Sequence, residues 1–202
     1  VDRMVGRIID SLKVNGLYQN TIIVFTSEHG EMMGDHGMLE KRTLYEESAR
    51  VPMLIKLQNQ NEMKKIKGSF SHIDLVPTLL SKIDQKLPEN LQGEDRSYAF
   101  EDLDFGNNEV VVSWNGTGEI DDRNLGTEKI NDLNQNPRRS IIINRIKLNM
   151  TLNDSAELFD LNKDPYEETN LIDSTEYQEI LKFMKEKLIE WQIKNEDTFR
   201  FE

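Results

Sequence analysis

The sequence predicts an α/β protein, in which part of a mostly parallel sheet is followed by a small antiparallel sheet with a packed C-terminal helix. Three observations predict this class. The β-branched run at residues 21–25 directly follows a helix-like pattern and is typical of a buried strand in a mostly parallel sheet. Short strand-like segments gather between residues 140 and 160. A last amphipathic pattern begins near residue 175, close to the end of the chain.

The first unit is predicted to span residues 1–87. Residues 2–15 place apolar side chains at spacings of three and four and are followed by a glycine, which predicts a helix that stops there. A strand at 21–26 follows after a short turn, and residues 51–55 predict a second strand. A further helix is expected over about residues 74–83.

The second unit is predicted to span residues 88–202. We expect a strand at residues 110–114, antiparallel strands at 140–143 and 146–150, and a segment at 157–160 that closes a small sheet with them. The polar stretch at 115–137 predicts a long surface loop. The final helix has an apolar stripe that predicts packing against the sheet, and it comprises Tyr177, Ile180, Leu181, Met184, Leu188 and Trp191.

Composition narrows the classes of function. The chain has 202 residues and a formal net charge of −12, which argues against nucleic-acid binding because phosphate contacts require a basic surface. No apolar run approaches the length of a membrane span. The chain contains no Cys, so disulfides and thiolate metal sites are excluded. An anionic substrate would need a local positive site against this global charge, and Lys41 with the adjacent Arg42 is the candidate.

Polar side chains follow the predicted strand at residues 21–26, at the edge where open α/β sheets place their ligand sites. Glu28 and His29 could hold a divalent cation, since a carboxylate and an imidazole are both metal ligands. Lys41 could neutralise an anion beside that cation. His36 could contact a substrate or donate a proton to a leaving alcohol.

Each of these residues also has a simpler interpretation. Glu28 could be an exposed acid, and His29 could cap the end of the strand. Lys41 could be a solvated lysine, as most are, and its neighbour Arg42 leaves the assignment of the cation open by one position. His36 could equally pack within its loop.

Several ordered motifs resemble sulfatases of the alkaline-phosphatase superfamily. That family carries Ser-Asp-His-Gly-Glu, then Gly-(Asp/Glu)-His-Gly and then a lysine, and this chain has similar residues at 27–31, 34–37 and Lys41. Two later segments are similar to the family's Asp-Leu-x-Pro-Thr-Leu helix and to its closing motif, at residues 72–80 and 157–171. The resemblance runs to about residue 171 and implies the C-terminal part of an alkaline-phosphatase-like α/β fold.

The resemblance also implies roles for the candidate residues. Glu28 and His29 stand where the family has metal ligands, with calcium the first candidate and manganese or magnesium the alternatives. The family has Asp where this chain has Glu28, whose carboxylate extends one methylene further. Lys41 would contact the oxygens of the sulfate ester, and His36 would be a further substrate contact.

Sulfatases of this type use a formylglycine made in a Cys/Ser-x-Pro-x-Arg motif, and this chain has no Cys and no Ser two residues before a Pro. We therefore expect a C-terminal portion of a sulfatase, inactive alone, whose nucleophile lies in an absent N-terminal part that is also its partner. The expected substrate is a sulfated small molecule or glycan, and the expected compartment is periplasmic, secreted or lysosomal. The alternatives are a phosphodiesterase or phosphonate hydrolase of the same superfamily and a non-catalytic detached domain.

Overall fold

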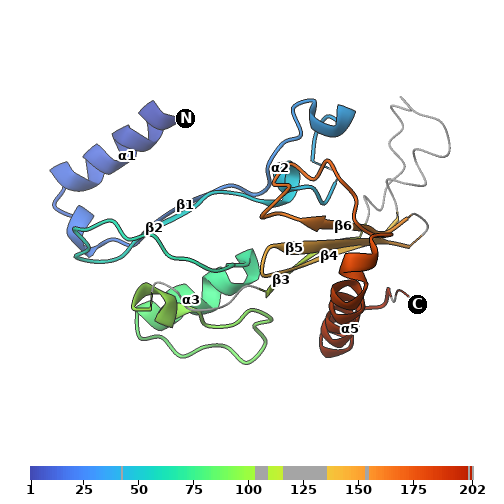
Figure 1. Cartoon of the computed structure of the whole chain (residues 1–202). Helices are drawn as coiled ribbons and strands as arrows, with labels where there is room; N and C mark the ends of the chain where they lie inside the picture. Colours follow the sequence, from blue (N-terminus) through green and yellow to red (C-terminus); the bar gives the residue numbers. More distant parts are fainter. Residues whose placement is uncertain (42, 103–108, 116–135, 153–154, 200, 202) are drawn as a thin grey trace, which may run out of the picture.

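The computed structural model describes residues 1–41, 43–102, 109–115, 136–152, 155–199 and 201. The predicted surface loop at 115–137 therefore lies almost wholly outside the described residues, and so does Arg42. In the remainder, helices and strands form a mixed α/β architecture with two small antiparallel sheets and a C-terminal helix (Figure 1). The predicted fold class is confirmed at this level.

The N-terminal part consists of helix α1 (Asp2–Val14) and the strand pair β1 (Ile23–Thr26) and β2 (Met53–Lys56). All three elements were predicted. β1 pairs with β2 antiparallel, and among the described residues neither strand has a parallel neighbour. Neither strand is fully buried, so the expected burial of residues 21–25 is not found in the described structure. A β-branched run indicates that a strand suits burial, but it does not specify which polypeptide covers it.

An apolar face of this N-terminal part is open to solvent. None of the residues of α1 is buried, and Met4 and Ile8 are 68% and 62% exposed. Phe25 and Leu54 of the strand pair are also exposed. Residues of α1, β1 and β2 line an open groove of about 700 Å³. In Figure 1, α1 lies at the end of the molecule away from the C-terminal helix.

Short helices lie between the strands of the first sheet and between the two sheets. α2 (Glu46–Ala49) is a single turn between β1 and β2, and α3 (Leu75–Lys82) follows β2. Five 3₁₀ turns complete the described helices, namely η1 (Tyr18–Asn20), η2 (Asp35–Gly37), η3 (His72–Asp74), η4 (Ser97–Phe100) and η5 (Thr175–Tyr177). The carboxylate of Asp74 accepts hydrogen bonds from the amide of Glu94 (2.8 Å) and from Nε of Arg96 (3.3 Å), so it fastens the chain after α3 back onto η3.

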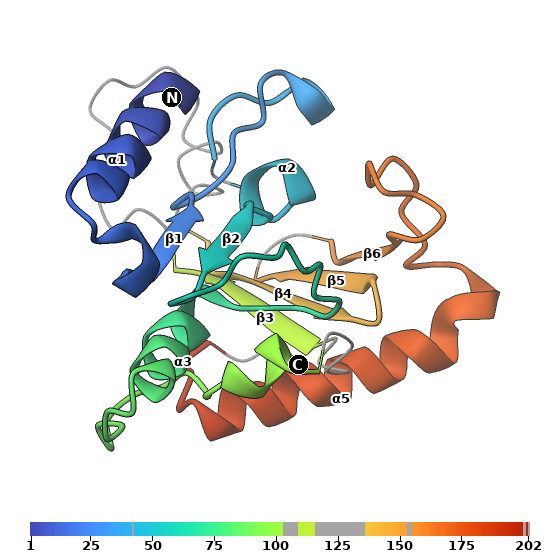
Figure 2. The ribbon, with the colours of Figure 1, turned by 90° about the vertical axis from the view of Figure 1, so that its left-hand side faces the viewer.

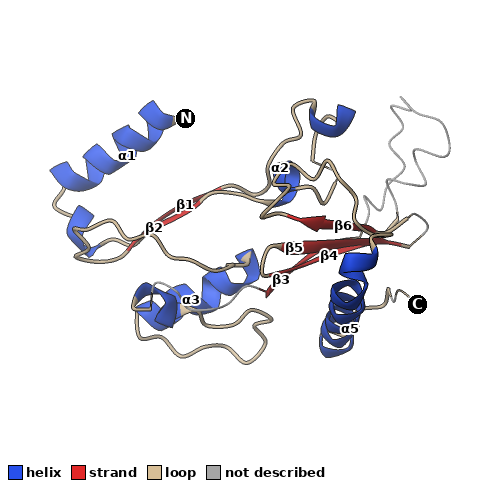
Figure 3. Cartoon of the chain, viewed as in Figure 1, coloured by secondary structure: helices blue, strands red, loops and turns tan. Residues whose placement is uncertain are grey.

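The second sheet confirms the four predicted strands and the antiparallel pairing of residues 140–143 with 146–150, and it adds the strand at 110–114 to the same sheet. Its strands are β3 (Glu109–Trp114), β4 (Arg138–Ile143), β5 (Ile146–Thr151) and β6 (Glu157–Asp160), in the spatial order β3-β4-β5-β6 (Figure 3). Each strand pairs with its neighbour in the chain. The division of the chain at residues 87 and 88 stays a prediction.

Helix α5 (Gln178–Lys194) runs along this sheet (Figure 2). The predicted stripe packs as expected at most positions, but Ile180 is 37% exposed and does not belong to the core. The buried cluster joins both layers and contains Ile141, Leu148, Met150, Leu158, Tyr177, Leu181, Met184, Leu188 and Phe201. The main apolar core of the described residues therefore lies between the second sheet and α5.

A buried ion pair joins this sheet to the chain after α5. Arg139 on β4 donates from Nε to Oδ2 and from a terminal nitrogen to Oδ1 of Asp197, both at 2.7 Å. Burial raises the pKa of Asp197 and is the largest single influence on it, but the hydrogen bonds from Arg139, the Phe199 amide and Gln192, with the charge of Arg139, together outweigh burial and hold that pKa below its ordinary value. The pair therefore contributes most to stability while the carboxyl is ionised.

Candidate active site

Glu28 and His29 lie together in the loop after β1. His29 Nδ1 is 2.7 Å from the carbonyl oxygen of Gly30, and because a carbonyl oxygen only accepts, Nδ1 must carry the hydrogen. In the neutral ring this leaves Nε2 with a free lone pair. Nε2 lies 3.9 Å from Oε2 of Glu28, whose side chain is 91% exposed, whereas that of His29 is 32% exposed. The two groups therefore face the same region, as their assignment as metal ligands requires.

The spacing of these two donors is compatible with one cation. Imidazole nitrogens bind metals at about 2.0–2.1 Å and carboxylate oxygens bind calcium at about 2.3–2.6 Å, so two ligands of one ion lie at most about 4.7 Å apart. Metal-binding histidines usually donate a hydrogen bond from the second ring nitrogen to a carbonyl or carboxylate, which fixes the orientation of the ring. Among the described residues, no group of three or more His, Cys, Asp or Glu side chains could hold a metal ion. Glu28 and His29 thus offer two possible donor atoms, which are fewer than a metal site requires.

Ser48 of α2 fixes the backbone on both sides of this loop. Its carbonyl oxygen accepts a hydrogen bond from the amide of Gly30 at 2.8 Å. Its hydroxyl donates to the carbonyl oxygen of Lys41 at 2.7 Å. A Cβ atom on residue 30 would collide with the carbonyl oxygen of Glu47, so only glycine permits this approach. The structure therefore brings the segments of His29 and Lys41 together on one helical turn.

The Lys41 side chain is exposed beyond this anchored backbone. It is accordingly available to an anion that enters from solvent. Arg42 lies outside the described residues, so the choice between the two neighbouring cations stays a prediction.

His36 is carried by a closed loop between these anchors. The loop is held by hydrogen bonds from the amide of Met32 to the carbonyl of Glu40 (2.8 Å) and from the amide of Gly34 to the carbonyl of Met38 (2.9 Å). The side chain of Met32 is completely buried and anchors the loop to the protein interior. His36 has a left-handed backbone, with φ of 52°, and its ring lies on the ring of Tyr45 with centroids 3.9 Å apart and planes within 3° of parallel. The imidazole is therefore held by one face in an otherwise exposed residue.

The sequence did not indicate the charged residues that support α2. The carboxylate of Glu46 lies 3.2 Å from Nζ of Lys147, a fully buried lysine on β5. The same ammonium lies 2.9 Å from the carboxylate of Glu167. Burial raises the pKa of Glu167, and Lys147 opposes that rise. Glu46 and Glu167 lie near or within segments that resemble family motifs, and this was the only sequence signal for them. Their pairing with Lys147 could not be predicted from local sequence, because Glu46 and Lys147 lie about a hundred residues apart.

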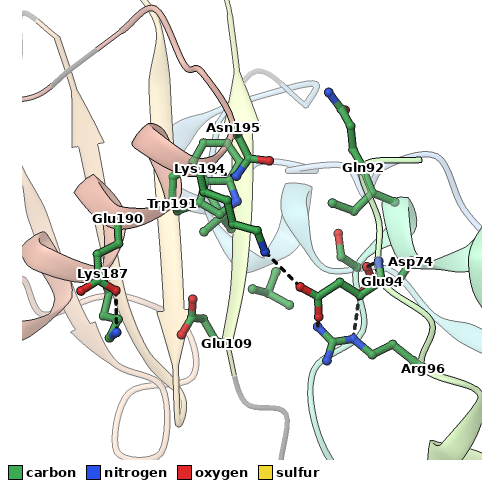
Figure 4. Close-up of a pocket in the computed structure, with 14 residues that line it drawn as sticks. Asp74, Gln92, Glu94, Arg96, Glu109, Lys187, Glu190, Trp191, Lys194 and Asn195 are labelled. Atoms are coloured by element: carbon green, nitrogen blue, oxygen red, sulfur yellow. Dashed lines mark hydrogen bonds and ion pairs between the residues drawn. The ribbon is translucent and has the colours of Figure 1, made fainter. Parts of the chain in front are cut away.

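A cavity of about 210 Å³ lies elsewhere, between α5, β3 and the segment after α3 (Figure 4). Most of its charged side chains pair with one another. Arg96 contacts both Asp74 (3.3 Å) and Glu94 (3.1 Å), and Lys194 contacts Glu94 (3.2 Å). None of the candidate site residues lines it. We therefore assign it to the contact between the two parts of the chain and not to the candidate site.

Glu28, His29 and a lysine whose backbone is anchored on the same helical turn therefore lie beside β1 in an α/β scaffold. Comparisons with known proteins show the family to which this scaffold belongs. The Sulfatase family model matches residues 1–84. The chain is 33% identical over 201 residues to a protein named uncharacterized sulfatase YidJ of Escherichia coli K12, and 32% identical over 194 residues to an arylsulfatase of Clostridium perfringens. These alignments cover 99% and 94% of this chain but 37% of each relative.

Solved structures show the same relationship. One, determined in complex with its substrate D-glucosamine-2-N,6-O-disulfate, has a TM-score of 0.77 and 27% identity and covers 98% of this chain and 39% of its own. The phosphonate monoester hydrolase of Agrobacterium radiobacter has a TM-score of 0.77 and 26% identity, covering 96% of this chain and 39% of its own. The matches place this chain in the sulfatase family of the alkaline-phosphatase-like superfamily, in its C-terminal region. The chain spans less than half the length of these relatives.

The helices in the described part of the chain include none with the length and apolar character needed to cross a bilayer.

Proposed function

We propose that this chain is part of a sulfatase that hydrolyses sulfate esters, and that residues 28–41 are its contribution to the active site. The observation that carries the proposal is the convergence on Ser48. In a member of the sulfatase family, one buried serine holds both the loop with the candidate metal ligands and the segment with the candidate anion-binding lysine. Such anchoring suits groups that must keep fixed relative positions during a reaction.

Glu28 and His29 would hold a divalent cation, calcium first and manganese or magnesium otherwise. The tautomer of His29 supports this assignment because it leaves Nε2 free beside the Glu28 carboxylate. When bound, the cation would polarise a sulfate oxygen. The remaining ligands would come from outside this chain, since the described residues supply only this pair.

Lys41 would bind the anionic ester. The chain carries a net charge of −12, so a substrate with a sulfate group requires a local cation to offset the surrounding field. An exposed ammonium on an anchored backbone meets that need and would stabilise the charge that grows on the departing oxygen. His36, held on Tyr45, would donate a hydrogen bond or a proton to the leaving alcohol.

The nucleophile, expected to be a formylglycine, would come from an N-terminal part of the same protein. The open apolar face on α1 and on the β1–β2 pair supports such a partner, because exposed patches of this kind usually mark an interaction surface. On this proposal the chain alone does not turn over a substrate. The periplasmic, secreted or lysosomal compartment suggested by the family resemblance stays a prediction.

The substrate would be a sulfated small molecule or glycan. A structural relative with a disulfated glucosamine substrate supports this class. The phosphonate monoester hydrolase among the structural relatives keeps phosphonate and phosphodiester hydrolysis as the second candidate, since phosphoryl and sulfuryl groups share tetrahedral geometry.

The test uses the complete polypeptide that contains this chain, with and without added calcium. We expect para-nitrophenyl sulfate to be hydrolysed faster than a para-nitrophenyl phosphonate monoester or a phosphodiester. Glu28→Gln and His29→Ala should weaken calcium binding measured by calorimetry, whereas Glu89→Gln, an exposed acid outside the site, should not. Preference for the phosphonate would support the second candidate. No hydrolysis of any ester would reject an enzymatic role.

A further inference from the structure

We infer that Tyr45 is a positioning residue for His36, and that the second sheet orients this imidazole through Tyr45. The inference deepens the proposed function and rests on it for its catalytic meaning. It assigns a task to β5 and β6, which lie more than a hundred residues from His36 in the chain and carry none of the candidate site residues.

The first step is the contact between the two rings. His36 lies at the exposed tip of the loop, and the nearly parallel ring of Tyr45 covers one face of its imidazole at 3.9 Å. A stacked ring restricts rotation of the imidazole about its side-chain bonds while leaving both ring nitrogens at the edge, free to meet a substrate. The stack therefore fixes orientation without occupying the groups that would react.

The second step is that Tyr45 is itself held on the second sheet. Its hydroxyl donates a 2.7 Å hydrogen bond to Oε1 of Glu157 on β6, and the other oxygen of that carboxylate accepts from Asn149 on β5 at 3.2 Å. The Tyr45 ring also meets Phe159 of β6 edge to face, with centroids 6.1 Å apart. Both the hydroxyl end and the edge of the tyrosine are thus tied to the sheet.

The third step concerns the backbone at Tyr45. The amide of the next residue, Glu46, donates to Oε2 of Glu167 at 2.6 Å. Lys147, fully buried on β5, lies between the carboxylates of Glu46 (3.2 Å) and Glu167 (2.9 Å). These contacts anchor the backbone just after Tyr45, at the start of α2, to Lys147 of β5 and to Glu167. The sheet, the tyrosine and the imidazole therefore form one continuous set of contacts.

A tyrosine that only packs would affect stability independently of His36, so a double-mutant cycle separates the two roles. In the complete polypeptide, we expect His36→Ala to lower kcat/KM for the sulfate ester by roughly 100-fold. Tyr45→Leu should lower it roughly 10-fold through misorientation of the imidazole. In the His36→Ala background, Tyr45→Leu should cause no further loss. Tyr45→Phe keeps the ring stack and should retain most activity, and Tyr166→Leu, at an exposed tyrosine, is the matched control.

Additive losses in the cycle would overturn the inference, as would full activity of Tyr45→Leu. A second measurement does not depend on turnover. Nuclear magnetic resonance of labelled histidine, with the His36 signals assigned by their loss in His36→Ala, should show those signals shifted by the tyrosine ring in the native protein and in Tyr45→Phe. The shift should be lost in Tyr45→Leu. If the His36 signals do not move, the inference is wrong whatever the activity; if they move but no ester is hydrolysed, the proposed function fails and the positioning contact stands.

Discussion

Ser48 binds Lys41 through its side chain and Gly30 through its main chain. The hydroxyl donates to the Lys41 carbonyl at 2.7 Å, and the Ser48 carbonyl accepts from the Gly30 amide at 2.8 Å. One buried residue therefore sets the separation between the segment with the candidate metal ligands and the segment with the candidate anion-binding lysine. The relationship makes α2 the structural centre of the site, although α2 itself supplies none of the proposed ligands.

Replacing Ser48 with alanine should remove only the contact with Lys41. We expect the free energy of unfolding to fall by about 1 kcal/mol, the usual net value of a lost hydrogen bond. Hydrolysis should fall by roughly 10-fold because the lysine segment is released from its anchor. Denaturant unfolding and steady-state kinetics measure the two effects. Ser81→Ala, which loses a comparable 2.6 Å bond to Asp95 outside the site, should lower stability without changing kcat/KM. Equal kinetic losses in both variants would contradict a special role for Ser48.

Gly30→Ala should displace the loop that carries His29. The added methyl group would meet the carbonyl oxygen of Glu47, and backbone on both sides has to move. We expect calcium affinity and hydrolysis both to fall, the latter by roughly 100-fold for a displacement of about 1 Å. Gly6→Ala in α1, where the added atom meets nothing within 4 Å, should leave both unchanged and favour the helix by about 0.5–1 kcal/mol. Unaltered calcium binding in Gly30→Ala would show that the loop tolerates the shift.

The buried triad of Lys147, Glu46 and Glu167 should respond asymmetrically to mutation. Lys147→Met leaves two carboxylates near each other without their cation, and we expect a loss of about 3–5 kcal/mol in the free energy of unfolding. Adding Glu46→Gln and Glu167→Gln removes those charges and should restore much of the loss. Chemical denaturation of the single and triple variants measures this, and a triple variant no more stable than Lys147→Met would refute the assignment.

The Arg139–Asp197 pair predicts a specific dependence of stability on pH. The folded-state pKa of Asp197 lies below its ordinary value, so the pair stabilises the fold above about pH 4 and loses that contribution as pH falls through the folded-state pKa. Asp197→Asn should cost about 3 kcal/mol at neutral pH, because it leaves a buried guanidinium without its counter-charge. The difference between the native protein and the variant should shrink as pH is lowered below about 4. A difference independent of pH would indicate that the hydrogen-bond geometry, and not the ionised carboxyl, supplies the stability.

The sequence predicted the elements of this fold well because their signals are local. Four short segments rich in β-branched and other apolar residues and the apolar stripe before Lys194 all form the strands and the helix that their patterns predict. Ile180 is not buried with the rest of the stripe. It lies at the margin of the stripe, on the part of the helix surface that faces solvent. The antiparallel pairing of β1 with β2 was missed, since β-branched composition shows that a strand suits burial and not the direction of its neighbour.

The candidate site was predictable only in part, for a related reason. Glu28 and His29 are adjacent in the chain, so a motif could bring them to notice, and the structure places their donor atoms 3.9 Å apart. Ser48 and Tyr45 contact Gly30, Lys41 and His36, which the motifs include, but no motif shows that these residues meet in the folded chain. The pairing of Lys147 with Glu46 spans 101 positions in the chain, and no periodicity or composition encodes such a distance. Residues that support a site can therefore be identified only from the folded structure, whereas candidate reacting residues can be proposed from the spacing of a sequence motif.

The uncovered apolar side of α1 has a practical consequence for anyone who makes this polypeptide. If the chain is produced by itself, the exposed Met4 and Ile8 can contact other hydrophobic surfaces in the cell, including the same face of another copy of the chain. Its yield should then depend on simultaneous synthesis of whatever normally covers that side. If the proposed function holds, the active site and the solubility of the protein would be completed in the same assembly step.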